Sequence, residues 1–313
     1  MNDDTVSHGV DQASGTGGSV TFGLMMPIFE DPELGRAPTF EEMAALGQDA
    51  RGIGFDALWV ADHFVMGNGG EEQLFLGVWE CFTLMAGLAA RVPGVRIGSM
   101  VVCTGFRNPG VVAKMAEMID EISGGNFILG LGAGWHKPEY DQFGLPFDHR
   151  ASRFEDAIRI IKPLLQARKA DYQGEFYQAN EALNIPRGPR ESGVPVLVGS
   201  NGARMLGLIA QYADGWNTAW HRDTSKVEPQ LAALDAACEA VGRDPKTLVK
   251  TAGLYFDDSF GRDEDDVANA VGLIGEFRRL GFAHLILQSF PLSPEKLATF
   301  GRVIEMVGAA QAE

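Results

Sequence analysis

A histidine next to an aspartate is the pair in this sequence best suited to acid–base chemistry. Asp62 and His63 lie at the end of a mostly apolar stretch, residues 56–64. An imidazole exchanges a proton near neutral pH, and a neighbouring carboxylate can fix which ring nitrogen carries that proton. We therefore take the two residues as the candidate catalytic pair. The alternative is a histidine that is simply hydrogen-bonded within a loop.

A glycine-rich run follows later in the chain. Residues 130–135 read GLGAGW and resemble a dinucleotide-binding fingerprint. That fingerprint requires a helix to begin within the glycine turn, whereas a loop is predicted here, so we reject a Rossmann fold. The glycines instead suggest close approach of the backbone to a flat ring. His136 and Glu139 come next, but no third ligand is evident, and we predict no metal site.

A second run, at residues 198–204, reads VGSNGAR and lies between an apolar strand and a helix. The free backbone N–H groups of a helix N-terminus, the Ser200 hydroxyl and the Arg204 guanidinium suit a phosphate group. An ordinary turn between a strand and a helix has the same sequence signature. Thr104 ends the third predicted strand and Arg107 lies in the loop after it, and both are further candidates for contact with an anionic ligand, although a solvated Arg107 fits the sequence equally well.

Aromatic side chains accompany these polar groups. Trp216 and Trp220 belong to the predicted sixth strand, while Phe64 follows the candidate catalytic pair and Trp135 ends the glycine-rich run. Aromatic walls suit a planar or apolar substrate, whereas tryptophans packed in the core are the alternative interpretation. We predict a substrate pocket formed by Phe64, Trp135, Glu139, Trp216 and Trp220.

Short apolar runs alternate with amphipathic stretches along the chain, which predicts a parallel sheet covered by helices. Strands are expected at 20–27, 56–64, 95–104, 126–135, 194–200, 213–220, 249–256 and 284–291. Helices are expected at 39–53, 78–91, 109–123, 150–167, 202–211, 224–241, 263–280 and 293–308. This count suits a closed (β/α)8 TIM barrel, whose strand ends would build the active site. A doubly wound open sheet is the competing arrangement.

Two segments depart from this alternation. Residues 1–19 contain no apolar core and are predicted to be a disordered tail rather than a signal peptide, which leaves one domain at 20–313. Residues 168–193 are predicted to form a hairpin around Gly174 and a proline-rich loop, inserted before the fifth strand. We expect this insertion to lie as a lid over the barrel mouth.

The overall composition excludes several classes of partner. The 313 residues carry 26 Lys and Arg against 42 Asp and Glu, a net charge of −16, which argues against nucleic acid or an anionic membrane surface. The three cysteines are widely spaced, so neither a disulfide framework nor a zinc site is predicted. No apolar run is long enough to span a bilayer. We expect a cytoplasmic protein that acts on a small molecule.

Four segments together resemble the luciferase-like flavin and deazaflavin oxidoreductases. They are LWVADHF (58–64), RIGSMVVCTGFRNPGVVAKM (96–115), ISGGNFILGLGAGWHKPEYDQFG (122–144) and VLVGSNGARMLGLIAQYADGWN (196–217). They lie in order and span most of the chain, and the branch most similar to them uses coenzyme F420, a deazaflavin. The resemblance implies a homodimer of (β/α)8 barrels, each holding an isoalloxazine-like ring at its carboxyl-terminal mouth.

The resemblance also implies roles for individual residues. His63 would lie beside the reactive ring, with Asp62 next to it. The third-strand kink at Met100 and Val101, often a non-proline cis peptide in this family, would back the ring, and Thr104 would contact it. The backbone beside the ring and the phosphate-binding turn are implied at Gly132, Ala133, Gly134, Gly199, Ser200, Asn201 and Gly202. In the sugar-phosphate dehydrogenase branch an acid follows the fourth-strand glycines; Trp135 occupies that place here, which argues against a sugar-phosphate dehydrogenase.

The leading hypothesis is a coenzyme F420-dependent oxidoreductase that transfers a hydride between the deazaflavin and a small organic substrate. Because that coenzyme has an anionic tail, we expect a cationic rim formed by Arg107, Lys137, Arg150 and Arg153. The first alternative is an FMN-dependent monooxygenase that uses reduced flavin, since the motifs of the two groups are nearly the same. The second alternative is a non-catalytic flavin-binding protein.

Overall fold

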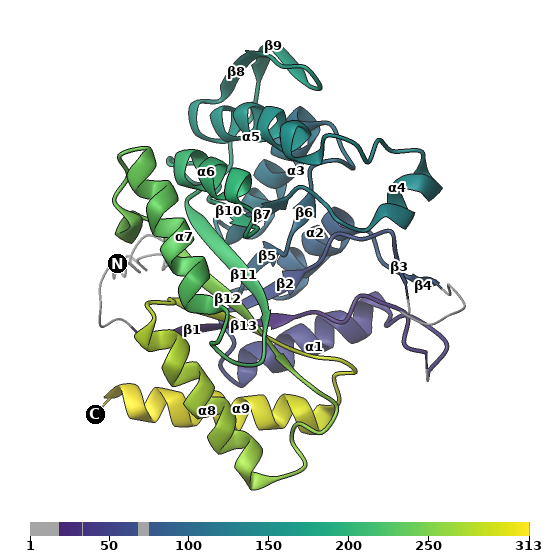
Figure 1. Cartoon of the computed structure of the whole chain (residues 1–313). Helices are drawn as coiled ribbons and strands as arrows, with labels where there is room; N and C mark the ends of the chain where they lie inside the picture. Colours follow the sequence, from purple (N-terminus) through teal and green to yellow (C-terminus); the bar gives the residue numbers. More distant parts are fainter. Residues whose placement is uncertain (1–18, 33, 68–74, 313) are drawn as a thin grey trace, which may run out of the picture.

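Eight parallel strands close into a barrel in the computed structural model, which describes residues 19–32, 34–67 and 75–312 (Figure 1). The predicted tail therefore lies outside the described residues, apart from Ser19. The last strand pairs with the first, and β7 pairs with β10, so the sheet has no open edge and the doubly wound alternative is excluded. The barrel strands are β1 (Thr21–Met25), β2 (Ala57–Val60), β5 (Arg96–Ser99) with β6 (Val102–Cys103), β7 (Phe127–Gly132), β10 (Val196–Gly199), β11 (Gly215–His221), β12 (Val249–Phe256) and β13 (His284–Ser289).

Helices surround this barrel at the predicted places. The outer ring consists of α1 (Phe40–Gly52), α2 (Cys81–Arg91), α3 (Pro109–Ile122), α5 (Arg150–Ala167), α6 (Ala203–Tyr212), α7 (Val227–Ala240), α8 (Glu264–Arg279) and α9 (Pro294–Ala312). The start of α1 illustrates why they begin where they do: the Thr39 hydroxyl accepts from the Glu42 N–H, and the Glu42 carboxylate accepts from the Thr39 N–H. The expected (β/α)8 fold is confirmed.

The strands form because their residues are apolar on both faces, one facing the barrel interior and the other facing the helices. Every residue of β2 and of β7 is buried. One polar chain crosses this core: the Trp59 indole N–H donates to Nε2 of His284 at 2.9 Å, and Nδ1 of that ring lies 2.8 Å from the Thr21 hydroxyl. Burial lowers the pKa of His284 well below its usual value, so the ring is neutral.

The third strand is broken in two. A cis peptide joins Met100 to Val101, as the family resemblance implied, and separates β5 from β6. Where the ladder is interrupted, the Ser99 hydroxyl donates to the Gly130 carbonyl and accepts from the Gly130 N–H, both at 2.9 Å. The side chain thus replaces the backbone pairing that the break removes.

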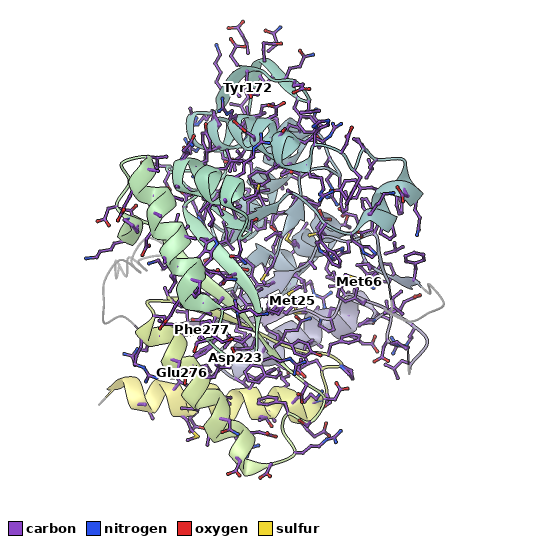
Figure 2. All side chains as sticks on the ribbon, in the orientation of Figure 1. Met25, Met66, Tyr172, Asp223, Glu276 and Phe277 are labelled. Carbon is purple, nitrogen blue, oxygen red and sulfur yellow. The ribbon has the colours of Figure 1, made fainter. Side chains whose placement is uncertain are left out.

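The insertion forms the expected hairpin, but it is not a lid. Strands β8 (Lys169–Gln173) and β9 (Gln178–Leu183) pair antiparallel and pack along α5 on the outside of the barrel (Figure 1). The Tyr172 hydroxyl donates to the Asp156 carboxylate of α5 at 2.7 Å, and Tyr172 lies at the outer edge of the molecule (Figure 2). The Tyr177 hydroxyl of the hairpin turn donates to the Thr104 carbonyl at 3.4 Å, but the paired strands lie along α5 and do not cover the barrel mouth, so the expected position is wrong.

The sequence analysis did not predict two small elements of secondary structure. The segment after β2 forms a two-stranded sheet of β3 (Val65–Gly67) and β4 (Phe75–Gly77). The segment after β7 contains the short helix α4 (Lys137–Phe143), where a loop was predicted. The helix ends at Gly144, whose φ of 67° is left-handed and favours glycine. Both elements lie beside the candidate site and shape it.

Candidate active site

The carboxyl ends of β2 and β7 bring the predicted polar and aromatic residues together. The His63 ring lies 5.9 Å from the Trp135 ring, nearly perpendicular to it, and 6.3 Å from the His136 ring. The ring of Phe29, which follows β1, lies on another side of His63, with the two ring centroids 6.2 Å apart. His63 is therefore framed by aromatic rings at the mouth of the barrel, where TIM-barrel enzymes carry their active sites.

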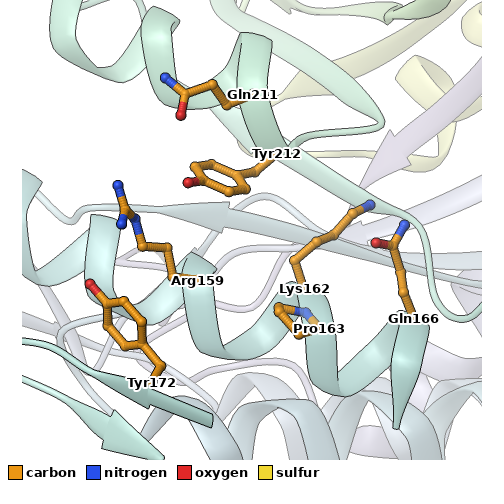
Figure 3. Close-up of a pocket in the computed structure, with 7 residues that line it drawn as sticks. All are labelled: Arg159, Lys162, Pro163, Gln166, Tyr172, Gln211 and Tyr212. Carbon is orange, nitrogen blue, oxygen red and sulfur yellow. The ribbon is translucent and has the colours of Figure 1, made fainter. Parts of the chain in front are cut away.

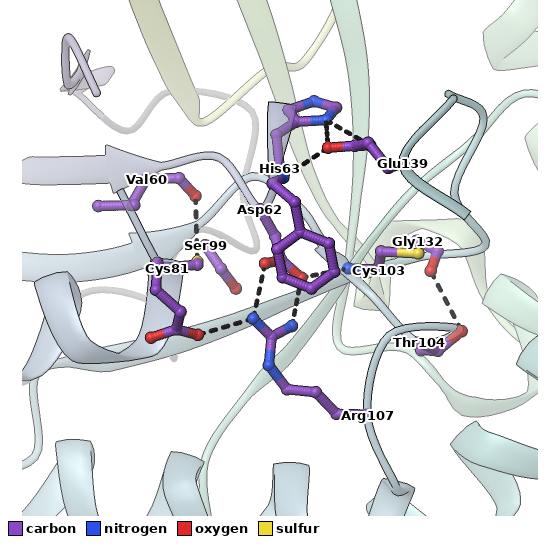
Figure 4. Close-up of polar contacts among 12 residues, drawn as sticks. Val60, Asp62, His63, Cys81, Ser99, Cys103, Thr104, Arg107, Gly132 and Glu139 are labelled. Carbon is purple, nitrogen blue, oxygen red and sulfur yellow. Dashed lines mark hydrogen bonds and ion pairs between the residues drawn. The ribbon is translucent and has the colours of Figure 1, made fainter. Parts of the chain in front are cut away.

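Glu139, not Asp62, is the carboxylate that holds His63. Nδ1 of His63 lies 3.0 and 3.1 Å from the two carboxylate oxygens of Glu139, and the backbone N–H of Phe64 donates to Oε1 at 2.5 Å (Figure 4). The Glu139 side chain is 1% exposed, so it lies beneath His63 rather than on the wall of a pocket. Its predicted role in the substrate pocket is therefore wrong.

Asp62 is occupied elsewhere. Its carboxylate binds the Arg107 guanidinium through two hydrogen bonds, at 2.6 and 2.9 Å, and accepts the Cys103 N–H at 2.9 Å (Figure 4). Glu80 binds the same guanidinium at 2.7 Å. Burial opposes the charge of Arg107, but the bonds to Asp62 outweigh it and raise its pKa. The expectations that Asp62 orients His63 and that Arg107 contacts an anionic ligand are both wrong.

The glycines of β7 and β10 make room for Val101. A Cβ atom on Gly132 would lie 2.5 Å from Cγ2 of Val101, and one on Gly199 would lie 3.0 Å from its Cγ1. Val101 is partly exposed and follows Met100 at the kink of the third strand. Its side chain thus fits between two strands whose residues have no side chains there. The glycines serve this internal contact, which the sequence interpretation had assigned to a ligand ring.

Thr104 and Gly134 also make internal contacts. The Thr104 hydroxyl donates to the Gly132 carbonyl at 3.2 Å, and the residue is 2% exposed. Gly134 has a φ of 79°, and a Cβ there would lie 2.6 Å from the sulfur of Cys103. That sulfur lies 2.9 Å from the Tyr140 hydroxyl. Burial raises the pKa of the Cys103 thiol to about 12, so it remains protonated.

The turn between β10 and α6 is exposed from Asn201 onwards. Gly202 is the N-cap of α6 and supplies no side-chain hydrogen bond, so the first N–H groups of the ten-residue helix lack a side-chain cap. Trp216 supports the turn from below by donating its indole N–H to the Ser200 carbonyl at 2.8 Å. Arg204 is held away by Ser152 and Glu155, both at 2.9 Å. The backbone of this turn, rather than Arg204, is available to an anion.

The predicted aromatic wall is only partly present. Trp135 is 65% exposed and Trp220 is 40% exposed, whereas Trp216 is completely buried. Trp216 is the second residue of β11, far from its carboxyl end, so it belongs to the core and its predicted place in the pocket is wrong. Phe64 packs between Phe106 and Phe143, with both ring separations at 4.5 Å.

The expected cationic rim does not form. Arg150 lies over the Phe147 ring with its guanidinium carbon 3.8 Å from the ring centroid and donates to the carbonyl of that residue. Each of the other three cations has an acidic partner, in the pairs Arg107 with Asp62, Lys137 with Asp141 and Arg153 with Asp148. The acidic partner of each pair, whether buried as Asp62 or exposed as Asp141, offsets the positive charge that the cation could offer to a ligand.

A surface hollow of about 410 Å³ lies outside the barrel (Figure 3). It is formed by α5 and by the end of α6, with Tyr172 of the hairpin at one side, and none of the predicted site residues lines it. Among the described residues, no cluster of three or more histidine, cysteine, aspartate or glutamate side chains could hold a metal ion. In the same part of the chain, no helix is long and apolar enough to cross a membrane.

Comparison with known proteins identifies the family. The family model of the luciferase-like monooxygenases matches residues 20–273. Pyrimidine monooxygenase RutA from Stutzerimonas stutzeri is 35% identical over 221 residues, which are 68% of this chain and 60% of that protein. RutA from Cronobacter sakazakii is 34% identical over 221 residues, which are 68% of this chain and 63% of that protein. The chain thus spans about three fifths of the length of these curated relatives.

Solved structures with the same fold are more distant in sequence. The coenzyme F420-dependent tetrahydromethanopterin reductase from Methanopyrus kandleri has a TM-score of 0.75 at 18% identity, covering 94% of this chain and 99% of that chain. An F420-dependent secondary alcohol dehydrogenase in complex with an F420-acetone adduct has a TM-score of 0.77 at 16% identity, covering 93% and 99%. Monooxygenase RslO1 from Streptomyces bottropensis has a TM-score of 0.71 at 17% identity, covering 93% and 98%.

These comparisons correct the leading functional hypothesis. The relatives that share about a third of the aligned residues are named monooxygenases, whereas the F420-dependent structures, at 16–18% identity, share the fold alone. The prediction of F420-dependent hydride transfer is therefore wrong, and the monooxygenase alternative is the better supported one. The matched residues cover most of the barrel, from β1 to α8. The chain belongs to the luciferase-like monooxygenase family.

Proposed function

We propose that this protein is an FMN-dependent monooxygenase that uses reduced flavin to oxygenate a small planar heterocycle of the pyrimidine class. The observation that carries the proposal is His63, which Glu139 holds by Nδ1 beside the exposed Trp135 at the barrel mouth. Among the described residues, no hydrogen bond involves Nε2 of His63. The relatives named pyrimidine monooxygenase support the reaction and the substrate class.

The residues at the mouth fit FMN. The uncapped N-terminus of α6 offers backbone N–H groups to a single phosphate, and the dipole of the helix favours the negative charge. Val101, partly exposed at the strand kink, would back the ring. Three of the four proposed rim residues have acidic partners, which suits the short phosphate of FMN better than a long anionic tail.

Bound reduced FMN would supply two electrons, so that substrate–H + O₂ + FMNH₂ gives substrate–OH + FMN + H₂O. Nε2 of His63 would exchange a proton with oxygen or substrate atoms at the mouth, and general acid–base catalysis of this kind contributes about 10²–10⁴-fold. Trp135 and Trp220 would stack against a planar substrate and exclude water.

The test combines binding and isotope incorporation. Purified protein should bind FMN, and with reduced FMN, ¹⁸O₂ and uracil it should release a product carrying one ¹⁸O atom. A His63→Gln variant should bind FMN comparably and lose about 10²-fold or more in turnover. Glu41→Gln, which alters an exposed ion pair between α1 and Arg91 of α2, is the matched control and should behave like the wild type.

Two results would contradict the proposal. Turnover that is unchanged without oxygen would exclude a monooxygenase. Full activity of His63→Gln would remove His63 from the chemistry. If uracil is inert while another planar heterocycle incorporates ¹⁸O, the reaction type stands and the substrate class is corrected.

A further inference from the structure

We infer that Glu139 is a positioning residue that fixes the tautomer of His63, so that the neutral ring is protonated on Nδ1 and presents an unprotonated Nε2 to the barrel mouth. Nothing in the sequence pattern pairs these two residues, which are 76 positions apart. The inference depends on the proposed function only for its activity readout, because the tautomer itself can be measured on the protein alone.

Both carboxylate oxygens of Glu139 lie near Nδ1 of His63, Oε1 at 3.1 Å and Oε2 at 3.0 Å, but only Oε1 also binds backbone N–H groups. Oε1 accepts two backbone N–H groups, from Phe64 at 2.5 Å and from Val65 at 3.2 Å. Oε2 lies 3.0 Å from Nδ1 of His63 and has no other hydrogen bond among the described residues (Figure 4). An ionised carboxylate can only accept, so Nδ1 must donate and the ring proton is held there.

The position of Glu139 does not depend on His63. The next residue of α4, Tyr140, is 1% exposed and anchors the helix by contacting the sulfur of Cys103 and donating to the Ala133 carbonyl. Glu139 is thus fixed by its own helix and by the backbone that follows His63. A carboxylate held in this way can impose an orientation on the ring, as the buried aspartate of a serine protease triad does for its histidine.

This geometry makes Glu139→Gln an informative substitution. The amide is nearly isosteric, and its carbonyl oxygen should take the Oε1 place, because two backbone N–H groups need an acceptor there. The NH₂ group then takes the Oε2 place, 3.0 Å from Nδ1, while the oxygen at 3.1 Å already accepts two backbone N–H groups and has little capacity left for a third donor. The NH₂ group therefore donates to Nδ1, and the ring proton moves to Nε2. The substitution should therefore invert the tautomer without removing the side chain.

The experiment measures the tautomer by two-dimensional long-range ¹H–¹⁵N spectra of histidine-labelled protein without cofactor, with His63 assigned from the signals lost in His63→Asn. We expect protonated Nδ1 in the wild type, protonated Nε2 in Glu139→Gln, and protonated Nδ1 in Glu139→Asp, which keeps a carboxylate. Glu41→Gln should leave the spectrum of His63 unchanged. In the reduced-FMN assay, Glu139→Gln should lower kcat by about 10²-fold or more, since a wrong tautomer costs about 10⁴-fold in a serine protease triad, while KM changes little.

Protonated Nε2 in the wild type, or a tautomer that Glu139→Gln does not change, would overturn the inference. If the tautomer inverts as expected but the wild type oxygenates no substrate, the assignment of Glu139 stands and the proposed function fails. If Glu139→Gln does not fold, the tautomer of His63 is compared between the wild type and Glu139→Asp, and this comparison tests the assignment of Glu139. Loss of the Nδ1 proton in that folded carboxylate variant would refute the assignment.

Discussion

Replacing Gly132 by alanine should strain the contact between β7 and Val101. The new Cβ would lie 2.5 Å from Cγ2 of Val101, whereas carbon atoms prefer about 3.5–4.0 Å, so about 1 Å or more must be made up by movement. Val101 also lies close to Gly199 and Gly130, since a Cβ placed on either would come within 3.0 Å or 3.3 Å of its Cγ1, so any movement of Val101 must be made towards these two backbones. Overpacking of this kind costs about 1–3 kcal/mol.

A double-mutant cycle separates this contact from other effects. Val101→Ala alone removes two carbon atoms and should cost at most about 1.6 kcal/mol, because the side chain is partly exposed. With Val101 shortened, the alanine at position 132 meets only the Cβ of residue 101 at 3.6 Å and the Gly199 carbonyl oxygen at 3.8 Å, which are ordinary contacts. The double variant should therefore be more stable than the sum of the single changes, by about 1–3 kcal/mol.

The assay is urea denaturation followed by tryptophan fluorescence, with FMN affinity measured on the same variants. Gly207→Ala is the matched control, because apart from the backbone of α6 itself no heavy atom lies within 4 Å of the added Cβ. That control should gain about 0.5–1 kcal/mol from the better helix former. A Gly132→Ala variant as stable as the wild type, or a cycle with no coupling, would refute the packing argument.

Three further outcomes follow from named contacts. Arg107→Met should reduce the free energy of unfolding at pH 7 by about 3–5 kcal/mol, because Asp62 is left buried without its partner; chemical denaturation checks this. The hydrogen bond from Arg36 and those from Thr39 lower the pKa of Glu42 from 4.5 to about 2, so its contribution is complete above about pH 4.5 and falls as the pH drops through about 2. The stability difference between wild type and Glu42→Gln should shrink over that range, and a constant difference would contradict the linkage. Thiol titration with an aromatic disulfide should detect no fast-reacting group in the native protein and three after denaturation, since all the cysteines are free and buried, at Cys81, Cys103 and Cys238.

The sequence was sufficient for the barrel because its information is local. Each barrel strand is a short apolar run, and each outer helix has its own periodicity and start signal, so both could be located without knowing their neighbours. The sequence did not distinguish the closed barrel from a doubly wound open sheet, because strands alternate with helices in both. The β8–β9 hairpin was recognised from its turn, but its place along α5 depends on contacts such as Tyr172 with Asp156, which no local pattern encodes.

The site was harder to predict because its hydrogen bonds join distant segments. The neighbour of His63 in sequence, Asp62, turns towards Arg107, while the carboxylate that reaches His63 comes from Glu139 on α4. Adjacent residues near a strand end point in different directions, so adjacency in sequence was a poor guide to contact. Trp216 was misplaced for a related reason, since it lies near the start of β11 rather than at its carboxyl end.

The polar residues that the sequence marked for ligands are largely used within the protein itself. Arg107 binds Asp62 and Glu80, Arg204 binds Glu155, and Thr104 donates to the backbone of β7. Charged and hydrogen-bonding groups satisfied in this way have few donors or acceptors left for a ligand. What remains open at the mouth is Nε2 of His63, the backbone at the start of α6 and the faces of two tryptophans. Under the proposed function, flavin recognition would therefore depend on backbone dipoles and shape, and the protonation of one histidine would depend on a carboxylate that the ligand never touches.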